Sequence, residues 1–179
     1  QRVAQDVGER FAQRGTDIVL GTIGWQNKNC QQVEEGNRDA DGNDIKGLGL
    51  FDYFTVAPNS RRKRCIGNIV VQTEITGKPV KVLGFENHGG QTQNVKTPFG
   101  KVLYGNGNCS KSECEGYFEK NVIATYLHGP MLSKNPEISD YMIEYCINRS
   151  ADSPEKLVPL DDKLEKECRK VMLDRLLKG

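Results

Sequence analysis

The chain has 179 residues and a formal net charge of +1, from 25 basic and 24 acidic side chains. Apolar residues make up 36% and charged residues 27%, which predicts one globular domain with a real core and excludes a disordered chain. The balanced charge gives no reason to expect nucleic acid or an anionic membrane as a partner. No apolar run in the sequence approaches the length of a membrane span.

The cysteines are spread along the chain without a CxxC pair, at Cys30, Cys65, Cys109, Cys114, Cys146 and Cys168. A chain of this length does not need disulfide staples, and no histidine lies near the pair at 109 and 114. We therefore expect no metal site and a cytoplasmic protein with reduced thiols.

The first part of the chain predicts a helix over residues 3–14, a short buried strand over 17–20 and a loop over 25–43. The middle of the chain is rich in strand signals. Apolar runs bounded by Gly, Pro and Asn predict strands at 50–56, 68–73, 80–85, 102–104, 116–118 and 122–127.

Helical signals return after residue 130. Asn135 can cap a helix that has Pro136 at its first position and runs to about residue 149. A last helix is predicted over 161–178, where apolar residues follow helical spacing. Strands flanked by helices predict the α/β class.

His128 is the residue that most directly suggests chemistry. It closes the apolar run 122–127 and is followed at once by Gly129 and Pro130. A histidine beyond the carboxyl end of a buried strand lies where α/β enzymes hold catalytic groups. The alternative is a histidine that merely ends a strand.

Several segments, in this order, carry a family resemblance: residues 47–52 (GLGLFD), 84–92 (GFENHGGQT), 104–108 (YGNGN), 115–116 (EG) and 125–130 (TYLHGP). They resemble the cobyric-acid-synthase-like (CobB/CobQ) class I glutamine amidotransferases, and among these the amidotransferase subunits of lipid II isoglutaminyl synthase. The resemblance implies a flavodoxin-like α/β fold with a mixed central sheet flanked by helices. Residues 1–179 would then form a single amidotransferase domain.

The resemblance also implies an activity and its residues. Glutamine would be hydrolysed by a cysteine–histidine pair without a metal or cofactor, and His128 matches the catalytic histidine. Arg64 matches an arginine that holds the glutamine substrate; a guanidinium suits an α-carboxylate because it donates two parallel hydrogen bonds. The alternative for Arg64 is a solvated basic loop over 61–64. His88, before two glycines, is expected to hold the shape of its loop, and Gln91 stands where many relatives have arginine.

The family's nucleophile lies in a Cys-Gly-Gly elbow shortly before the segment that matches residues 41–49. Here Cys30 is followed by Gln31 and Gln32, so no tight turn is evident to expose its thiol. We expect the segment with the elbow, before about residue 39, to be absent from this chain or altered, and we do not assign Cys30 as the nucleophile.

The implied partner is a Mur-ligase-like, ATP-dependent subunit in a heterodimer, which uses the ammonia to amidate the D-glutamate of lipid II in peptidoglycan synthesis. Two alternatives stay open. One is a non-catalytic binding or scaffold domain that keeps the fold, as a missing elbow would allow. The other is an amidotransferase of cobalamin biosynthesis.

Overall fold

The computed structural model describes residues 19–22, 34–38, 43–46, 51–57, 64–149 and 153–179. The helix predicted over residues 3–14 and the cysteine at position 30 lie outside these ranges. In the described ranges no helix is long and apolar enough to cross a membrane.

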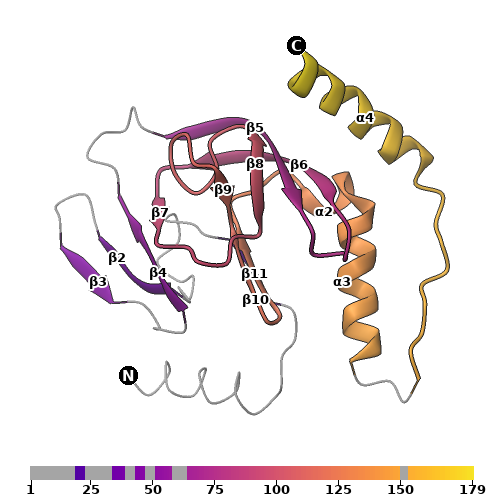
Figure 1. Ribbon diagram of the computed structural model, residues 1–179, viewed down its shortest axis with the longest axis horizontal. Helices are drawn as coiled ribbons and strands as arrows, with labels where there is room; N and C mark the ends of the chain where they lie inside the picture. Colours follow the sequence, from indigo (N-terminus) through magenta and orange to yellow (C-terminus); the bar gives the residue numbers. More distant parts are fainter. Residues whose placement is uncertain (1–18, 23–33, 39–42, 47–50, 58–63, 150–152) are drawn as a thin grey trace.

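The strands of the described residues are β1 (Val19–Thr22), β2 (Glu34–Arg38), β3 (Asp44–Lys46), β4 (Phe51–Val56), β5 (Cys65–Thr73), β6 (Val80–His88), β7 (Gln91–Gln93), β8 (Gly100–Tyr104), β9 (Cys114–Glu115), β10 (Tyr117–Glu119) and β11 (Val122–Thr125). The helices are α2 (Met131–Lys134), α3 (Pro136–Asn148) and α4 (Lys163–Lys178) (Figure 1). The α/β class predicted from the sequence is therefore confirmed.

The strands are distributed among three hydrogen-bonded sheets. One has the order β1-β11-β10, with β1 parallel and β10 antiparallel to β11. The second has the order β3-β2-β4-β7 and is also mixed, because β2 runs parallel to β4. The third, β6-β5-β8-β9, is antiparallel throughout. The polar network described below lies where β6 meets the segment that follows β11.

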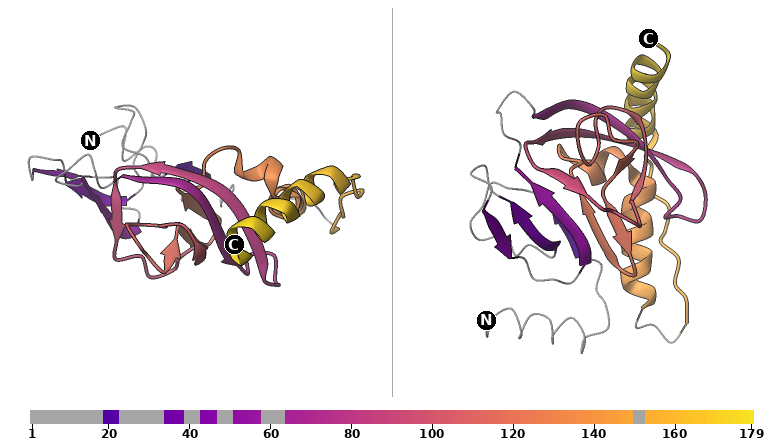
Figure 2. Two further views of the ribbon diagram at one scale, coloured as in Figure 1. Left: turned by 90° about the horizontal axis from the view of Figure 1, so that it is seen from above. Right: turned by 60° about the vertical axis from the view of Figure 1, so that its left-hand side comes forward.

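The main core packs α2 and α3 against β5, β6 and β11. Its fully buried members are apolar and mostly β-branched, as expected for strands that are covered on both faces: Ile69, Val71, Val82, Ile123 and Ile138. This core fixes the relative position of two sheets, and the chain crosses from one to the other just after β11. Figure 2 shows α3 lying beside the long β5–β6 hairpin.

Two expectations about secondary structure were wrong. The stretch 25–43 was expected to be a loop, but Glu34–Arg38 forms β2. It has no apolar alternation, and it is a strand because it pairs with β3 on one side and β4 on the other. The last strand was expected to reach residue 127, but it ends at Thr125.

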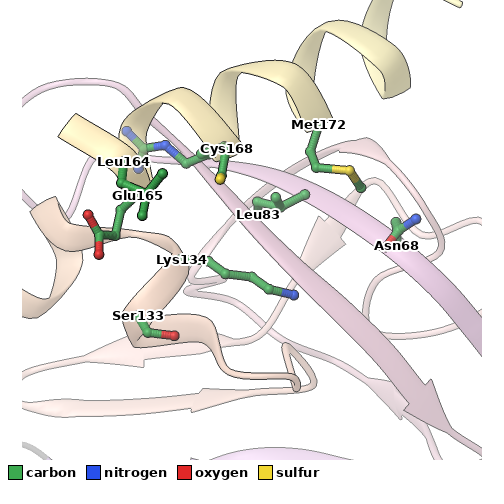
Figure 3. A pocket seen from close by; sticks show the side chains of 9 residues that line it. Asn68, Leu83, Ser133, Lys134, Leu164, Glu165, Cys168 and Met172 are labelled. Atoms are coloured by element: carbon green, nitrogen blue, oxygen red, sulfur yellow. The ribbon is translucent and has the colours of Figure 1, made fainter. Parts of the chain in front are cut away.

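Helix α4 confirms the predicted C-terminal helix but is not a core element. None of its residues is buried, and Leu164 and Val171 are 68% and 67% exposed. An ion pair between Arg169 and Glu137 attaches α4 to α3. A pocket of about 430 Å³ remains beneath the helix, between Leu83 of β6 and side chains of α2 and α4 (Figure 3).

Candidate functional site

His128 lies three residues beyond the end of β11, where the chain passes from one sheet to another. Its backbone pairs with β6: His128 N–H donates to Phe85 O (2.7 Å), and Phe85 N–H donates to His128 O (3.1 Å). The side chain is half-buried. Among the described residues, none makes a hydrogen bond to its ring. The backbone is thus fixed while the imidazole stays available to a ligand.

The approach of β6 to this segment depends on a glycine. A Cβ on Gly84 would lie 2.4 Å from Leu127 Cδ2 and 2.9 Å from Leu127 Cβ. Leu127 is itself buried in the core, so it has little room to retreat. Glycine at position 84 therefore lets Phe85 come close enough to pair with His128.

Asn135 makes a second attachment to the same strand. Its side chain was expected to cap α3, but no capping hydrogen bond is formed. Instead Asn135 Oδ1 accepts from Leu83 N–H (2.8 Å), and Asn135 Nδ2 donates to Leu83 O (2.8 Å) and to Met131 O (2.6 Å). Fully buried, this amide pairs with β6 as a backbone would. The segment from His128 to Asn135 is consequently tied to β6 at both ends.

Arg64 lies directly before β5, at the end of the β5–β6 hairpin where His88 also lies. Its guanidinium is exposed, and Nη2 donates to Asn87 Oδ1 (2.8 Å). Arg64 therefore attaches to β6 two residues beyond the one that pairs with His128. No direct contact joins the Arg64 and His128 side chains in the described part of the chain. The Arg64 guanidinium and the His128 backbone are thus both attached to the C-terminal half of β6.

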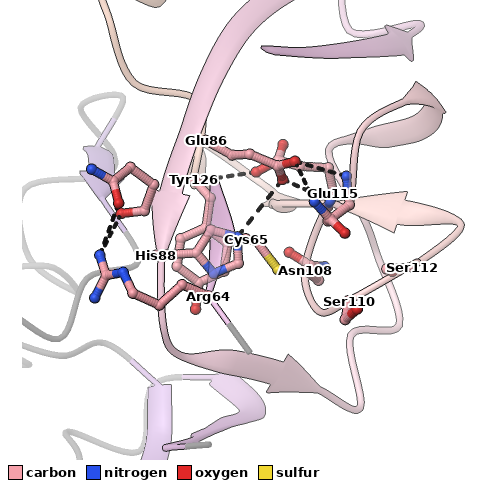
Figure 4. A network of polar contacts seen from close by, with 12 residues as sticks. Arg64, Cys65, Glu86, His88, Asn108, Ser110, Ser112, Glu115 and Tyr126 are labelled. Carbon is pink, nitrogen blue, oxygen red and sulfur yellow. Dashed lines mark hydrogen bonds and ion pairs between the residues drawn. The ribbon is translucent and has the colours of Figure 1, made fainter. Parts of the chain in front are cut away.

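Glu86 is fully buried next to these residues (Figure 4). Its carboxylate accepts hydrogen bonds from Asn106 N–H and Asn106 Nδ2 (both 2.8 Å) and from Gly107 N–H (3.0 Å). Burial raises the pKa of Glu86, but the interactions with His88 and with these donors outweigh it and leave the pKa below its ordinary value. Glu86 is therefore an ionised carboxylate inside the protein.

The loop that binds Glu86 requires its second glycine. Gly107 has a φ of +83°, and a Cβ there would lie 2.5 Å from the Cys114 carbonyl oxygen. Asn108 closes the loop by accepting from Gly116 N–H (2.8 Å) and donating to Gly116 O (3.1 Å). The YGNGN motif thus builds a rigid set of donors for one buried anion.

Glu115, on β9, supports the residues just before His128. Its Oε1 accepts from Tyr126 N–H (2.7 Å) and from Thr125 Oγ1 (2.9 Å), while its Oε2 has no hydrogen-bond partner among the described residues. Burial raises the pKa of Glu115 to about 8, against the smaller effect of these two hydrogen bonds. Glu115 is accordingly a neutral acid at pH 7, unlike Glu86.

The thiol of Cys65 is not suited to be the nucleophile. Cys65 is buried at the start of β5, and burial raises the pKa of its thiol, with a hydrogen bond from Gln91 opposing the rise only in part. A nucleophilic thiol needs the opposite shift.

The two positions singled out from the sequence, His128 and Arg64, are attached to the same strand of the structure. Sequence reasoning missed the roles of Glu86, Glu115 and Asn135. A signal existed for Glu86, which directly follows the predicted strand 80–85, because a charged residue next to a buried strand is rarely buried unless it is paired. Glu115 and Asn135 had no comparable signal.

Comparison with known proteins identifies the family of the chain. The family of CobB/CobQ-like glutamine amidotransferase domains matches residues 29–136. The subunit GatD of lipid II isoglutaminyl synthase (glutamine-hydrolyzing) from Staphylococcus aureus (strain N315) is 38% identical over 135 residues, which cover 75% of this chain and 53% of that protein. The same subunit from Streptococcus pneumoniae (strain ATCC BAA-255 / R6) is 34% identical over 131 residues, 72% of this chain and 49% of that protein.

A more distant relative is a probable cobyric acid synthase from Methanococcus maripaludis (strain C7 / ATCC BAA-1331). It is 32% identical over 144 residues, 78% of this chain and 28% of that protein. Matches to the two GatD subunits span about half of their lengths, 53% and 49%. Since the family match covers more than half of the chain, this protein belongs to the CobB/CobQ-like glutamine amidotransferase domain family.

Proposed function

We propose that the protein is the glutamine-hydrolysing subunit of a lipid II isoglutaminyl synthase. The observation that carries the proposal is the placement of His128: its backbone is fixed to β6 by two hydrogen bonds while its ring is left available. Arg64 directly precedes β5, and its guanidinium contacts Asn87 of β6, so it brings a positive charge to the strand that pairs with His128. The names of the two GatD relatives supply the reaction class.

In the proposed reaction, a cysteine thiolate attacks the side-chain amide carbon of glutamine after His128 has taken the thiol proton. The C–N bond breaks as His128 returns that proton to the departing ammonia, which leaves a thioester. Water then hydrolyses the thioester, with His128 as the base, to give glutamate and the free thiol. Arg64 holds the α-carboxylate of glutamine through two parallel hydrogen bonds.

Burial lowers the pKa of His128, and repulsion from His88 lowers it further. The imidazole is therefore neutral over a wider range of pH than an exposed histidine, as a proton acceptor has to be. This state is what the first step of the proposed reaction requires.

The ammonia would pass to a Mur-ligase-like partner that activates the D-glutamate carboxylate of lipid II with ATP. Such a transfer needs a complex of the two subunits, because ammonia released into water is protonated and diffuses away. We place this heterodimer in the cytoplasm.

A second candidate function is a non-catalytic scaffold with the same fold. The observation that favours it is the residue pair after Cys30, which is Gln31-Gln32 and not the Gly-Gly of the nucleophile elbow. Glycines are the residues that most readily allow the sharp turn and the close approach of backbone N–H groups to an oxyanion.

An assay of ammonia release from glutamine separates the two functions. We expect the full-length protein, purified together with a Mur-ligase-like subunit and supplied with ATP and lipid II, to release ammonia and form amidated lipid II. Sequencing of the complete gene is the accompanying control, and a Cys-Gly-Gly elbow upstream of residue 39 is expected. A folded full-length complex that binds its partner and never releases ammonia would favour the scaffold.

Arg64→Lys should weaken glutamine binding by about 1–3 kcal/mol, because an ammonium cannot reproduce the two-point contact of a guanidinium. The measurement is the KM for glutamine in the ammonia-release assay. Arg62→Lys, the same exchange in the same basic run, is the matched control and should leave KM unchanged. An unchanged KM for Arg64→Lys would instead assign Arg64 to the solvated basic loop.

A further inference from the structure

His88, the last residue of β6, is the other histidine of the chain and is 5% exposed. Its ring stacks on that of Tyr126, with the ring centroids 3.6 Å apart and the planes 7° from parallel (Figure 4). Tyr126 precedes His128 by two residues, and His88 follows Phe85, the backbone partner of His128, by three. The two histidines are thus connected by two short routes, one through the stacked Tyr126 ring and one through the Phe85–His128 backbone pair.

The contacts of His88 indicate its protonation state. Nδ1 lies 2.8 Å from the Gly90 carbonyl oxygen, which can only accept, so Nδ1 carries a hydrogen. Nε2 is buried and has no hydrogen-bond partner within the described residues. The charged atom that it faces is Glu86 Oε2, at 3.8 Å.

A neutral His88 would direct the lone pair of Nε2 at the Glu86 carboxylate. That arrangement is repulsive and leaves a buried acceptor unsatisfied. With a hydrogen on Nε2, the same geometry becomes a contact between opposite charges. Glu86 is ionised, since its interaction with His88 and three hydrogen bonds from Asn106 and Gly107 outweigh the effect of burial on its pKa.

The other titratable groups near His88 do not supply a compensating charge. Glu115, on β9, is neutral because burial raises its pKa to about 8. Cys65, which pairs with His88 across the β5–β6 ladder, is neutral because burial raises the pKa of its thiol. Tyr126 presents its ring face, and its hydroxyl is directed to Thr92 (2.7 Å). Glu86 is therefore the ionised group that stabilises a charge on His88.

We propose that His88 is a positioning residue, held as an imidazolium between Gly90 and Glu86, and that its charge keeps His128 in the neutral form that accepts the thiol proton. The role of His128 as acceptor of the thiol proton rests on the proposed function. The charge on His88 and its effect on His128 do not depend on glutamine hydrolysis.

The test is NMR of the protein labelled with ¹⁵N-histidine. The chain has two histidines, so two imidazole signals are expected, and a His128→Gln variant assigns them. In the wild-type protein at pH 7, both ring nitrogens of His88 should give the signal of a protonated imidazolium, and His128 should be neutral. In His88→Gln, the titration midpoint of His128 should move upward, because the repelling charge is gone.

Two further variants separate the effect of the His88 charge from the effect of its ring packing against Tyr126. Glu86→Gln keeps the His88 ring and removes the anion that stabilises its second proton, so the His128 midpoint should again move upward. Tyr126→Phe keeps the stacked ring and removes only the hydroxyl group, so the midpoint should stay where it is. Amide spectra of each variant verify the fold.

Two results would overturn the proposal. One is a neutral His88 without a hydrogen on Nε2 in the wild-type protein at pH 7, and the other is an unchanged titration midpoint of His128 in a folded His88→Gln variant. If His88→Gln does not fold, the wild-type ring-nitrogen signals decide alone. The ammonia-release assay is independent of these spectra. An inactive protein with a charged His88 would therefore refute the proposed function and leave this inference standing.

Discussion

Replacing His128 with alanine should abolish glutamine hydrolysis and leave the protein folded. In the proposed mechanism the imidazole is both the base that activates the thiol and the acid that protonates ammonia, and such proton transfers contribute about 10²- to 10⁴-fold each to a rate. Stability should change little, because the backbone pairing with Phe85 does not involve the side chain, which is only half-buried. Ammonia release and thermal unfolding of the full-length variant are the two measurements.

His88→Ala is the matched control because it removes the other histidine from the same end of β6. It should lower the free energy of unfolding by about 1–3 kcal/mol, since it removes a buried hydrogen bond to the Gly90 carbonyl, the contact with Glu86 and the ring stack on Tyr126. Some activity should survive, because His128 is still present. If His128→Ala hydrolysed glutamine normally, or if only His88→Ala were folded and inactive, the roles of the two histidines would be reversed.

The strands at the centre of the fold were predictable because their sequences contain the local signal. The runs that became β5 and β6 are rich in Val and Ile and end at turn residues, so burial and backbone preference agree. β2 was not predictable for the opposite reason. Its residues Glu34–Arg38 have no strand pattern, and pairing with the next two strands, β3 and β4, determines its conformation.

The site was predictable where a residue type and its place in an element were enough. His128 was identified from a strand end followed by Gly-Pro, and Arg64 from the family resemblance; their chemical roles stay predictions. The role of Asn135 was not predictable from a capping pattern, because its partner Leu83 is 52 residues away. The ionisation of Glu86 and Glu115 could not be predicted either. Both are fully buried, and what separates them is the contact of Glu86 with His88 and the larger number of donors around Glu86.

Glu115→Gln should remove a large pH dependence of stability. Burial raises the pKa of Glu115 to about 8 in the folded protein, from an ordinary value of 4.5. Between these two values the folded state binds more protons than the unfolded state, so wild-type stability falls as pH rises from about 4.5 to about 8 and is level beyond. At 1.36 kcal/mol for each pKa unit, the loss is on the order of a few kcal/mol.

Glutamine at position 115 is isosteric and never ionises. Its Oε1 can still accept from Tyr126 N–H and Thr125 Oγ1, so the fold should be kept. The measurement is the difference between the wild-type and variant free energies of urea unfolding, taken at several pH values from 4 to 9. Groups with shifted pKa values in both proteins, such as Glu86 and His128, cancel in that difference.

The two proteins should be similarly stable near pH 4, and the glutamine variant should become the more stable one as pH rises toward 8. The sign of the trend decides between two states of Glu115. If Glu115 were ionised and hydrogen-bonded in the folded protein, the stability of the wild type relative to the variant would increase as pH rises. A difference that is constant over the whole range would show that Glu115 has the same charge in the folded and unfolded states. Its buried Oε2 would then need a partner that the described residues do not supply.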